Sequence, residues 1–144
     1  MSLNGPINDS TQVPDPDEQS LKAILIVDDN PHILRFMESL LRSRGYQVYS
    51  TPSPSEALLI CQAQSDGLLM AIVDYSVSSE VHSNLPAKLR ALAPRMKIVL
   101  TSGLPEAECT PADSLPAYDA FLPKPFLPAE LISTVQRYYP ATQS

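Results

Sequence analysis

The stretch Ala23-Ile24-Leu25-Ile26-Val27-Asp28-Asp29 places two adjacent carboxylates directly after five apolar residues. A short continuous apolar run of this kind is typical of a strand that is buried on both faces of a parallel sheet. Carboxylates at the mouth of such a strand are stable only when they are paired, protonated or bound to a cation. The stretch therefore predicts a central strand whose carboxyl end carries chemistry.

Three further apolar runs end in reactive or charged side chains. Leu68–Val73 leads into Asp74, Ile98–Leu100 into Thr101, and Ala120–Pro123 into Lys124. The intervals between them are long enough for the strand-helix-strand units that a parallel sheet requires. The carboxyl ends of parallel strands meet at one edge, where open α/β sheets bind ligands, so these groups are expected to form one site. Its expected members are Asp28, Asp29, Asp74, Thr101 and Lys124.

Segments with helical spacing separate the strands. The first helix begins after Asn30 with Pro31 at its first position and stops at Gly45. The whole pattern alternates strand and helix and predicts a doubly wound α/β domain of the (βα)5 type. The expected strands are 23–27, 46–50, 68–73, 95–100 and 118–122, and the other expected helices are 53–63, 85–92 and 128–139.

The fourth helix is expected to be degraded. Pro105, Pro111 and Pro116 lie between the fourth and fifth strands. Because a proline inside a helix costs about 3 kcal/mol, they leave room for only a short helix over Glu106–Cys109.

Charge and composition restrict the classes of partner. The chain of 144 residues carries a net charge of −6, and four of its acids precede residue 21. The basic residues are scattered along the chain, which argues against direct binding of nucleic acid. Residues 1–20 are polar, acidic and proline-bearing, and predict a disordered tail or linker ahead of a domain at 21–140, with 141–144 as a C-terminal tail.

The sequence also bears on the cellular location of the segment and on whether its cysteines or histidines could bind a metal. No apolar stretch reaches the length of a membrane span and no signal-peptide order is present, so we expect a cytoplasmic segment without membrane contact. Cys61 and Cys109 have no close-set partners and indicate neither a disulfide framework nor a zinc site; Cys61 is expected in the core. His32 and His82 likewise lack a second ligand at metal spacing and are expected to be solvated or packed.

Four motifs in order resemble the receiver domain of two-component response regulators, over about residues 22–139. They are Ile24–Asn30, Ile72–Asp74, Leu100–Gly103 and Phe121–Phe126. The resemblance implies a flavodoxin-like sheet with the strand order 2-1-3-4-5. It also implies a cis peptide bond before Pro125, which would aim Lys124 into the site.

The chemistry that these groups can perform is phosphoryl transfer onto an aspartate, because a carboxylate is a competent nucleophile once the charge on the phosphoryl group is neutralised. Asp74 is the expected phosphoacceptor, and oxygen ligands of this kind suit Mg2+. The resemblance implies that Asp29 and Asp74 bind Mg2+ directly, Asp28 largely through water, and Ser76 through its main-chain carbonyl. Lys124 would pair with a phosphoryl oxygen. The implied donor is a phosphohistidine on a histidine kinase or a histidine phosphotransfer protein.

Thr101 and Phe121 are expected to form a switch. The hydroxyl of Thr101 can turn toward a new phosphoryl oxygen and vacate space that an aromatic ring then enters. In receivers, an aromatic residue three positions before the lysine often moves in this way, and Phe121 has that position. A static core phenylalanine is the competing interpretation.

Two departures from the family pattern keep a second function open. Ser78 and His82 replace the proline and the glycine that usually follow the acceptor, and the fourth helix is shortened. The alternative is therefore a receiver-like protein-interaction module that does not cycle phosphate, and a standard dimer is not assumed. A true aspartyl-phosphate phosphatase is disfavoured because Tyr75 and Ser76, not a second aspartate, follow Asp74. We expect no enzyme beyond self-directed phosphotransfer and autodephosphorylation, in a segment attached to another module such as a hybrid sensor kinase.

Overall fold

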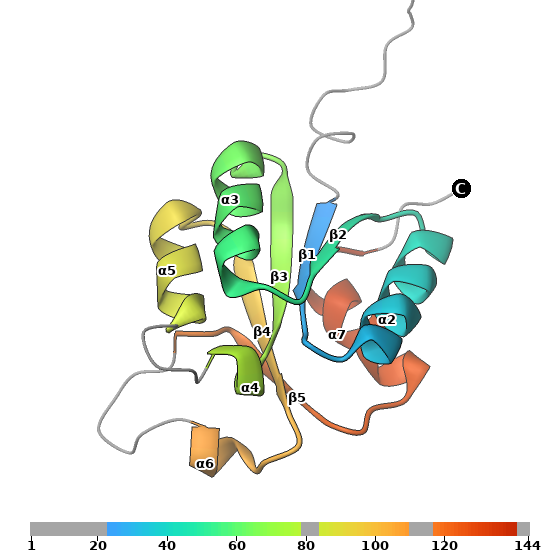
Figure 1. Ribbon diagram of the computed structural model, residues 1–144. Helices are drawn as coiled ribbons and strands as arrows, with labels where there is room; N and C mark the ends of the chain where they lie inside the picture. The colour runs from blue at the N-terminus through green and yellow to red at the C-terminus, as the bar shows by residue number, and fades with distance from the viewer. Residues whose placement is uncertain (1–22, 79–83, 110–116, 141–144) are drawn as a thin grey trace, which may run out of the picture.

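A computed structural model describes residues 23–78, 84–109 and 117–140 of the chain (Figure 1). The tails expected at 1–20 and 141–144 lie outside the described residues, as do His82, Pro111 and Pro116. The domain boundaries predicted from the sequence therefore stay predictions.

The described strands form one parallel sheet with the order β2-β1-β3-β4-β5. This is the predicted 2-1-3-4-5 order, and the fold class is confirmed. All residues of the central strands β1 and β3 are buried, which explains why their sequences, apart from Asp74 at the end of β3, are continuously apolar rather than alternating. The strand bounds are β1 Ala23–Val27, β2 Gln47–Thr51, β3 Leu68–Asp74, β4 Lys97–Ser102 and β5 Ala120–Pro123.

Helices cover both faces of the sheet (Figure 1). Helices α2 and α7 pack over one face and α3 and α5 over the other, each face with its own apolar core. Within the described ranges, no helix is long and apolar enough to span a membrane. The helix bounds are α2 Pro31–Ser43, α3 Pro54–Gln64, α4 Tyr75–Ser78, α5 Leu85–Leu92, α6 Glu106–Cys109 and α7 Pro128–Tyr138.

The two cores take their residues from both strands and helices. Ile24 and Ile26 of β1 meet Met37 and Leu41 of α2 and Leu131 of α7 on one face. On the opposite face, Leu25 and Val27 meet Cys61, Leu85 and Leu89. Cys61 is fully buried, as predicted, and burial raises the pKa of its thiol. The alternation along β1 thus fixes the sheet between two helical layers.

The start and stop of α2 are the ones predicted from sequence. The side-chain oxygen of Asn30 accepts hydrogen bonds from the backbone N–H groups of His32 and Ile33, at 2.9 and 3.2 Å. Pro31 occupies the first helical position, where its missing N–H has no consequence. Gly45 has a φ of +94°, a left-handed conformation that glycine adopts without strain after a helix. This cap fixes the chain that leads from Asp28 and Asp29 into α2.

The ends of β4 and β5 differ from the prediction. β4 begins at Lys97 rather than Arg95 and continues through Thr101 and Ser102, which pair with Leu122 and Pro123 of β5. The residues before Lys97 form a turn closed by the bond from Met96 N–H to the Ala93 carbonyl, at 3.0 Å. The short helix expected at Glu106–Cys109 is confirmed, whereas α4 was not predicted.

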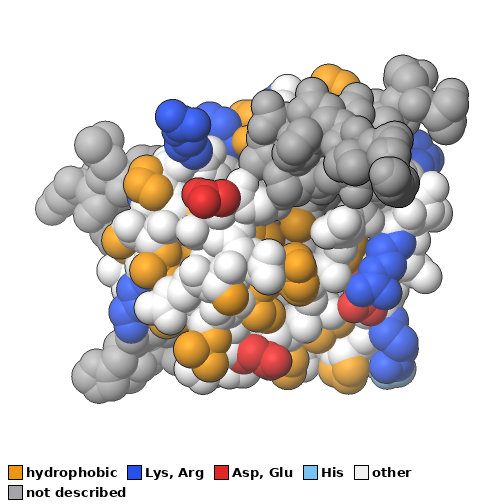
Figure 2. Space-filling model, turned by 90° about the horizontal axis from the view of Figure 1, so that it is seen from above, with side chains coloured by type: hydrophobic (Ala, Val, Ile, Leu, Met, Phe, Trp, Pro, Cys, Tyr) orange, Lys and Arg blue, Asp and Glu red, His pale blue; other side chains and the backbone are white. Residues whose placement is uncertain are grey.

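Charges are mixed on the end of the molecule where the strands begin. Figure 2 looks onto that end and shows basic and acidic side chains interspersed with apolar ones over the visible face. This distribution is in keeping with the scattered basic residues of the sequence.

Candidate functional site

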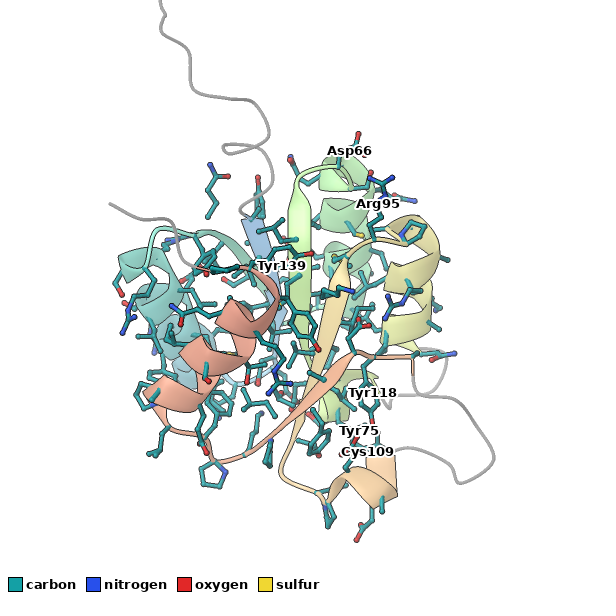
Figure 3. All side chains as sticks on the ribbon, turned by 180° about the vertical axis from the view of Figure 1, so that it is seen from behind. Asp66, Tyr75, Arg95, Cys109, Tyr118 and Tyr139 are labelled. Atoms are coloured by element: carbon teal, nitrogen blue, oxygen red, sulfur yellow. The ribbon has the colours of Figure 1, made fainter. Side chains whose placement is uncertain are left out.

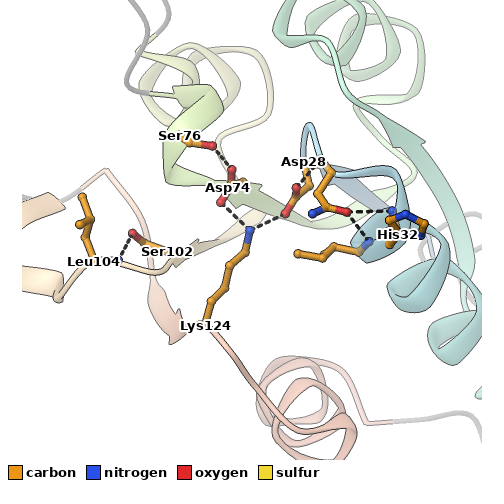
Figure 4. Close-up of polar contacts among 9 residues, drawn as sticks. Asp28, His32, Asp74, Ser76, Ser102, Leu104 and Lys124 are labelled. Carbon is orange, nitrogen blue, oxygen red and sulfur yellow. Dashed lines mark hydrogen bonds and ion pairs between the residues drawn. The ribbon is translucent and has the colours of Figure 1, made fainter.

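The four strand ends singled out from sequence meet at one edge of the sheet. Asp28 follows β1, Asp74 closes β3, Thr101 lies near the end of β4, and Lys124 follows β5. In register, Asp74 lies opposite Thr101, which itself lies opposite Leu122. Figure 4 shows Asp28, Asp74 and Lys124 pointing toward one another. The parallel topology thus gathers groups that are far apart in sequence.

Lys124 bridges two carboxylates. Its ammonium donates hydrogen bonds to Asp28 Oδ2 and to Asp74 Oδ1, each at 2.8 Å. Its side chain is 19% exposed, so both ion pairs are largely shielded from water. Burial alone would lower the pKa of the Lys124 amine, but the hydrogen bonds to the two carboxylates outweigh it and raise that pKa. Lys124 is therefore charged at neutral pH. The Lys124–Pro125 peptide bond is cis, as the resemblance implied.

Asp28 is fully buried at the centre of the site. Its second oxygen, Oδ1, accepts a hydrogen bond from the Asn30 N–H at 2.8 Å. Burial raises the pKa of the Asp28 carboxyl, the nearby Asp74 adds to that, and the bonds from Lys124 and Asn30 oppose it. The carboxylate is thus held in place by donors on both of its oxygens.

Asp28, Asp29 and Asp74 form a cluster of three carboxylates. One oxygen from each lies within 4.8 Å of the others, and Asp29 is the exposed member. When all three are ionised, one ammonium leaves two negative charges uncompensated, which matches the charge of a divalent cation. Carboxylate oxygens open to solvent on one side are also the ligands that Mg2+ prefers, because it keeps several waters. The donor set therefore fits this ion.

Ser76 contributes a contact that the sequence reasoning missed. Only its main-chain carbonyl was expected to take part, yet its side-chain hydroxyl donates a hydrogen bond to Asp74 Oδ2 (Figure 4). Ser76 lies in the short helix α4, directly after β3. Serine two residues from an aspartate is within reach of a local hydrogen bond, and that spacing was the available signal.

Thr101 is buried, and its hydroxyl oxygen has no hydrogen-bond partner within the part of the chain that the structure describes. Such groups are rare, because an unpaired buried hydroxyl costs free energy. Phe121 of β5 lies opposite Leu100, and its ring packs against Tyr118 with centroids 6.3 Å apart. The switch proposed for Thr101 and Phe121 stays a prediction.

An apolar hollow adjoins the site. It has a volume of about 370 Å3 and reaches the Lys124 side chain. Phe36 is 38% exposed beside it, and its ring lies 6.2 Å from that of Phe126. Apolar surface next to charged groups is typical of a protein-binding site. The lining residues are Ile33, Phe36, Gly103, Lys124, Pro125 and Phe126.

Other polar residues lie at the margins. His32 is exposed, as predicted, and its Nδ1 lies 3.2 Å from Arg35 Nη2. Figure 3 shows Tyr75, Tyr118 and Cys109 near the end of the sheet that holds the site, and Asp66, Arg95 and Tyr139 at the opposite end.

The hydroxyl of Tyr118 donates a hydrogen bond to Glu106 Oε2 at 2.8 Å, which links α6 to the residues just before β5.

Comparisons with known proteins agree with this geometry. The family model for the response regulator receiver domain matches residues 24–136. The chain is 32% identical over 116 residues to the sensor kinase CckA of Brucella abortus (strain 2308). That match covers 78% of this chain but spans only 12% of the length of the kinase.

Two solved structures have the same fold. A response regulator receiver domain protein (CheY-like) from Methanospirillum hungatei JF-1 is 30% identical, with a TM-score of 0.72 over 81% of this chain and 92% of that chain. A response regulator protein from Burkholderia pseudomallei is 26% identical, with a TM-score of 0.65 over 81% of this chain and 71% of that chain. The crystal structure of the latter holds a phosphorylated aspartic acid, a calcium ion and citrate.

Proposed function

The chain belongs to the family of response regulator receiver domains of two-component systems, and from this premise we propose that Asp74 is its phosphoacceptor. Asp74 closes the central strand β3, and its side chain faces Lys124 and Asp28. The proposed phosphoryl donor is a phosphohistidine on a histidine kinase or a histidine phosphotransfer protein. The similarity to the sensor kinase CckA supports a donor of this class.

The contact of Lys124 with both Asp28 and Asp74 carries the proposal. A lysine buried against two carboxylates has a fixed position, so its ammonium is available to a phosphoryl oxygen without reorganisation. Asp28 keeps it charged and in place when Asp74 changes its bonding. The buried hydroxyl of Thr101, which has no partner among the described residues, is a second donor for that group. Such preorganised donors stabilise the charge that develops during phosphoryl transfer.

The proposed reaction exchanges one bond to phosphorus for another. An oxygen of Asp74 forms a P–O bond while the P–N bond to the donor imidazole breaks, and the imidazole takes up a proton. Mg2+ held by Asp28, Asp29, Asp74 and the carbonyl of Ser76 would neutralise charge on the phosphoryl oxygens. Lys124 and Thr101 hold the transferred group in the acyl phosphate. Water later cleaves the P–O bond and returns inorganic phosphate and the Asp74 carboxylate.

The apolar hollow beside Lys124 is the proposed docking place for the phosphodonor protein. It reaches Lys124, which contacts Asp74, and its rim carries the exposed ring of Phe36. An apolar side chain near the phosphohistidine would bury that ring while the imidazole reaches Asp74. The proposal extends to a receiver segment that acts with, or within, a hybrid sensor kinase.

The second function is an interaction module that does not cycle phosphate. Its support is the shortened helix α6 together with Ser78 and His82 in place of the usual proline and glycine. The same experiment separates the two functions, because only the first requires a covalent phosphate on Asp74.

The test is intact-mass analysis after incubation with acetyl phosphate, with and without Mg2+. The matched variant is Asp74→Asn, which keeps the shape of the side chain and removes the nucleophile. We expect one added phosphate in Mg2+, none in EDTA, and none in the variant. A wild-type chain that gains no phosphate, and that also does not bind beryllofluoride, would favour the interaction module.

A further inference from the structure

The two oxygens of the Asp74 carboxylate bind different kinds of donor. Oδ1 accepts from the Lys124 ammonium at 2.8 Å, and Oδ2 accepts from the Ser76 hydroxyl (Figure 4). The donors also differ in their surroundings, since Lys124 is 19% exposed and anchored to Asp28, whereas Ser76 is an exposed residue of α4. Both sides of the acceptor are therefore occupied in the resting protein.

The two donors differ in how easily they are displaced. The bond from the Lys124 ammonium joins two opposite charges, whereas the bond from the Ser76 hydroxyl to the same carboxylate has only one charged partner. Moving Lys124 away from Asp74 would also disturb its bond to the buried Asp28. The Ser76 hydroxyl is neutral, and a rotation about one side-chain bond turns it toward solvent. Oδ2 is thus the oxygen that can be released at lower cost.

We propose that the Ser76 hydroxyl is a removable cap on Asp74 Oδ2, which must turn away before that oxygen binds a cation or attacks a phosphoryl group. Ser76 is a positioning residue in this scheme, because it acts through Asp74. The part that concerns attack on phosphorus rests on the proposed function. The part that concerns cation binding stands on the hydrogen bond alone.

A cap of this kind competes with everything that uses Oδ2. Removing it takes away one hydrogen bond that the incoming cation would otherwise have to break. Since the net value of a hydrogen bond to a charged group is about 1.5–3 kcal/mol, cation affinity should rise about ten- to hundredfold without it. The rate of phosphorylation at low Mg2+ should rise by a similar factor. Substitutions of the side chain leave the main-chain carbonyl of Ser76 in place.

The experiment compares two variants of matched shape. Ser76→Thr keeps the hydroxyl, and Ser76→Val has the same branched shape without it; Ser76→Ala is a third variant that adds no bulk. Ser55→Ala, at an exposed serine of α3, controls for the loss of a surface hydroxyl. Binding of Mn2+ is counted from the electron paramagnetic resonance signal of the free ion, with Asp74→Asn to identify the site. Phosphorylation by acetyl phosphate is then followed by intact mass at low and saturating Mg2+.

We expect the alanine and valine variants to bind Mn2+ more tightly than the wild type, while the threonine and control variants bind as the wild type does. Equal affinity in all variants would overturn the proposal. So would weaker binding in the alanine and valine variants, because the hydroxyl would then support the cation rather than compete with it. A wild type that gains no phosphate contradicts the proposed function, and the Mn2+ titration still decides whether Ser76 is a cap.

Discussion

Lys124 and Asp74 are 50 residues apart in sequence, yet the lysine ammonium and the aspartate oxygen Oδ1 lie 2.8 Å apart. The same ammonium also binds Asp28, which is 96 residues away. One side chain thus joins the ends of β1, β3 and β5 across the edge of the sheet. In the proposed function, this structural link is also the group that binds the phosphoryl oxygen.

Lys124→Met should lower the free energy of unfolding by about 1–3 kcal/mol in EDTA, because Asp28 and Asp74 lose their shared donor while staying largely buried. Mg2+ should reduce the loss by supplying another positive charge to the cluster. Urea unfolding with and without Mg2+ measures both effects. Arg95→Met, at an exposed arginine before β4, is the control. A loss that is the same in EDTA and in Mg2+ would contradict the shared-charge account.

Asp119→Asn should destabilise the fold in a pH-dependent way. Burial tends to raise the pKa of Asp119, but hydrogen bonds from Ile98 N–H and Arg90, each at 2.8 Å, outweigh it and lower that pKa below 3.8. A carboxyl with a lowered folded pKa stabilises the fold above its unfolded pKa and loses that contribution as the pH falls through the folded value. We expect a loss of about 1–2 kcal/mol at neutral pH, which shrinks as the pH falls below 3.8.

The measurement for Asp119 is chemical unfolding over a series of pH values. Asp66→Asn is the control, because Asp66 is an exposed carboxylate. A loss for Asp119→Asn that is constant across the acid range would show that geometry rather than charge is responsible.

Tyr118→Phe should loosen α6. The change removes the hydroxyl that binds Glu106 and keeps the ring that packs against Phe121. α6 has four residues, none of them buried, so this one bond should matter to its position. The alkylation rate of the partly exposed Cys109 should rise about two- to fivefold, while the buried Cys61 stays unreactive. Tyr138→Phe, which removes a hydroxyl from α7, should leave the Cys109 rate unchanged.

Phe36→Ala should slow phosphorylation by a phosphohistidine protein and leave phosphorylation by acetyl phosphate unchanged. The exposed Phe36 ring would be buried by a docked protein but does not touch a small donor. Loss of a large apolar contact at an interface should weaken docking about tenfold or more. Rates at several donor concentrations separate docking from transfer. Leu59→Ala is the control, because Leu59 is an exposed apolar residue on a different helix, α3. An equal weakening of docking by Leu59→Ala would contradict the proposal that the hollow is the docking place.

The fold could be predicted from the sequence because its strongest signals agree with one another. The buried run Ala23–Val27 and the capped helix after Asn30 identify the first strand-helix unit, and Leu85–Leu92 was predicted with the observed bounds. Short elements and strand ends could not be predicted as well, because they contain too few residues to show a hydrophobic pattern. Helix α4 contains only four residues, too few for a hydrophobic period, and the start of β5 depends on the tertiary contact of Asp119 with Ile98.

The candidate site could be predicted as a set of residues but not as a set of contacts. Strand ends and parallel topology suffice to gather Asp28, Asp74 and Lys124, whatever the side-chain rotamers. The hydroxyl of Ser76 reaches Asp74 because helix α4 begins directly after β3; the two-residue spacing permits this contact but does not specify it.

The Tyr46 hydroxyl donates to the Tyr139 carbonyl at 2.5 Å, and Gln47, the residue after Tyr46, pairs with Ala23 at the start of β1. The described domain therefore begins at β1 and ends after α7 at the same end of the sheet, opposite the end where Asp28 and Asp74 lie. A polypeptide attached to either end of this domain would therefore lie away from the edge of the sheet that carries Asp28, Asp74 and Lys124. Donor and acceptor fluorophores fused before Ala23 and after Pro140 would likewise sit close together, so energy transfer between them would start high and report small displacements of α7.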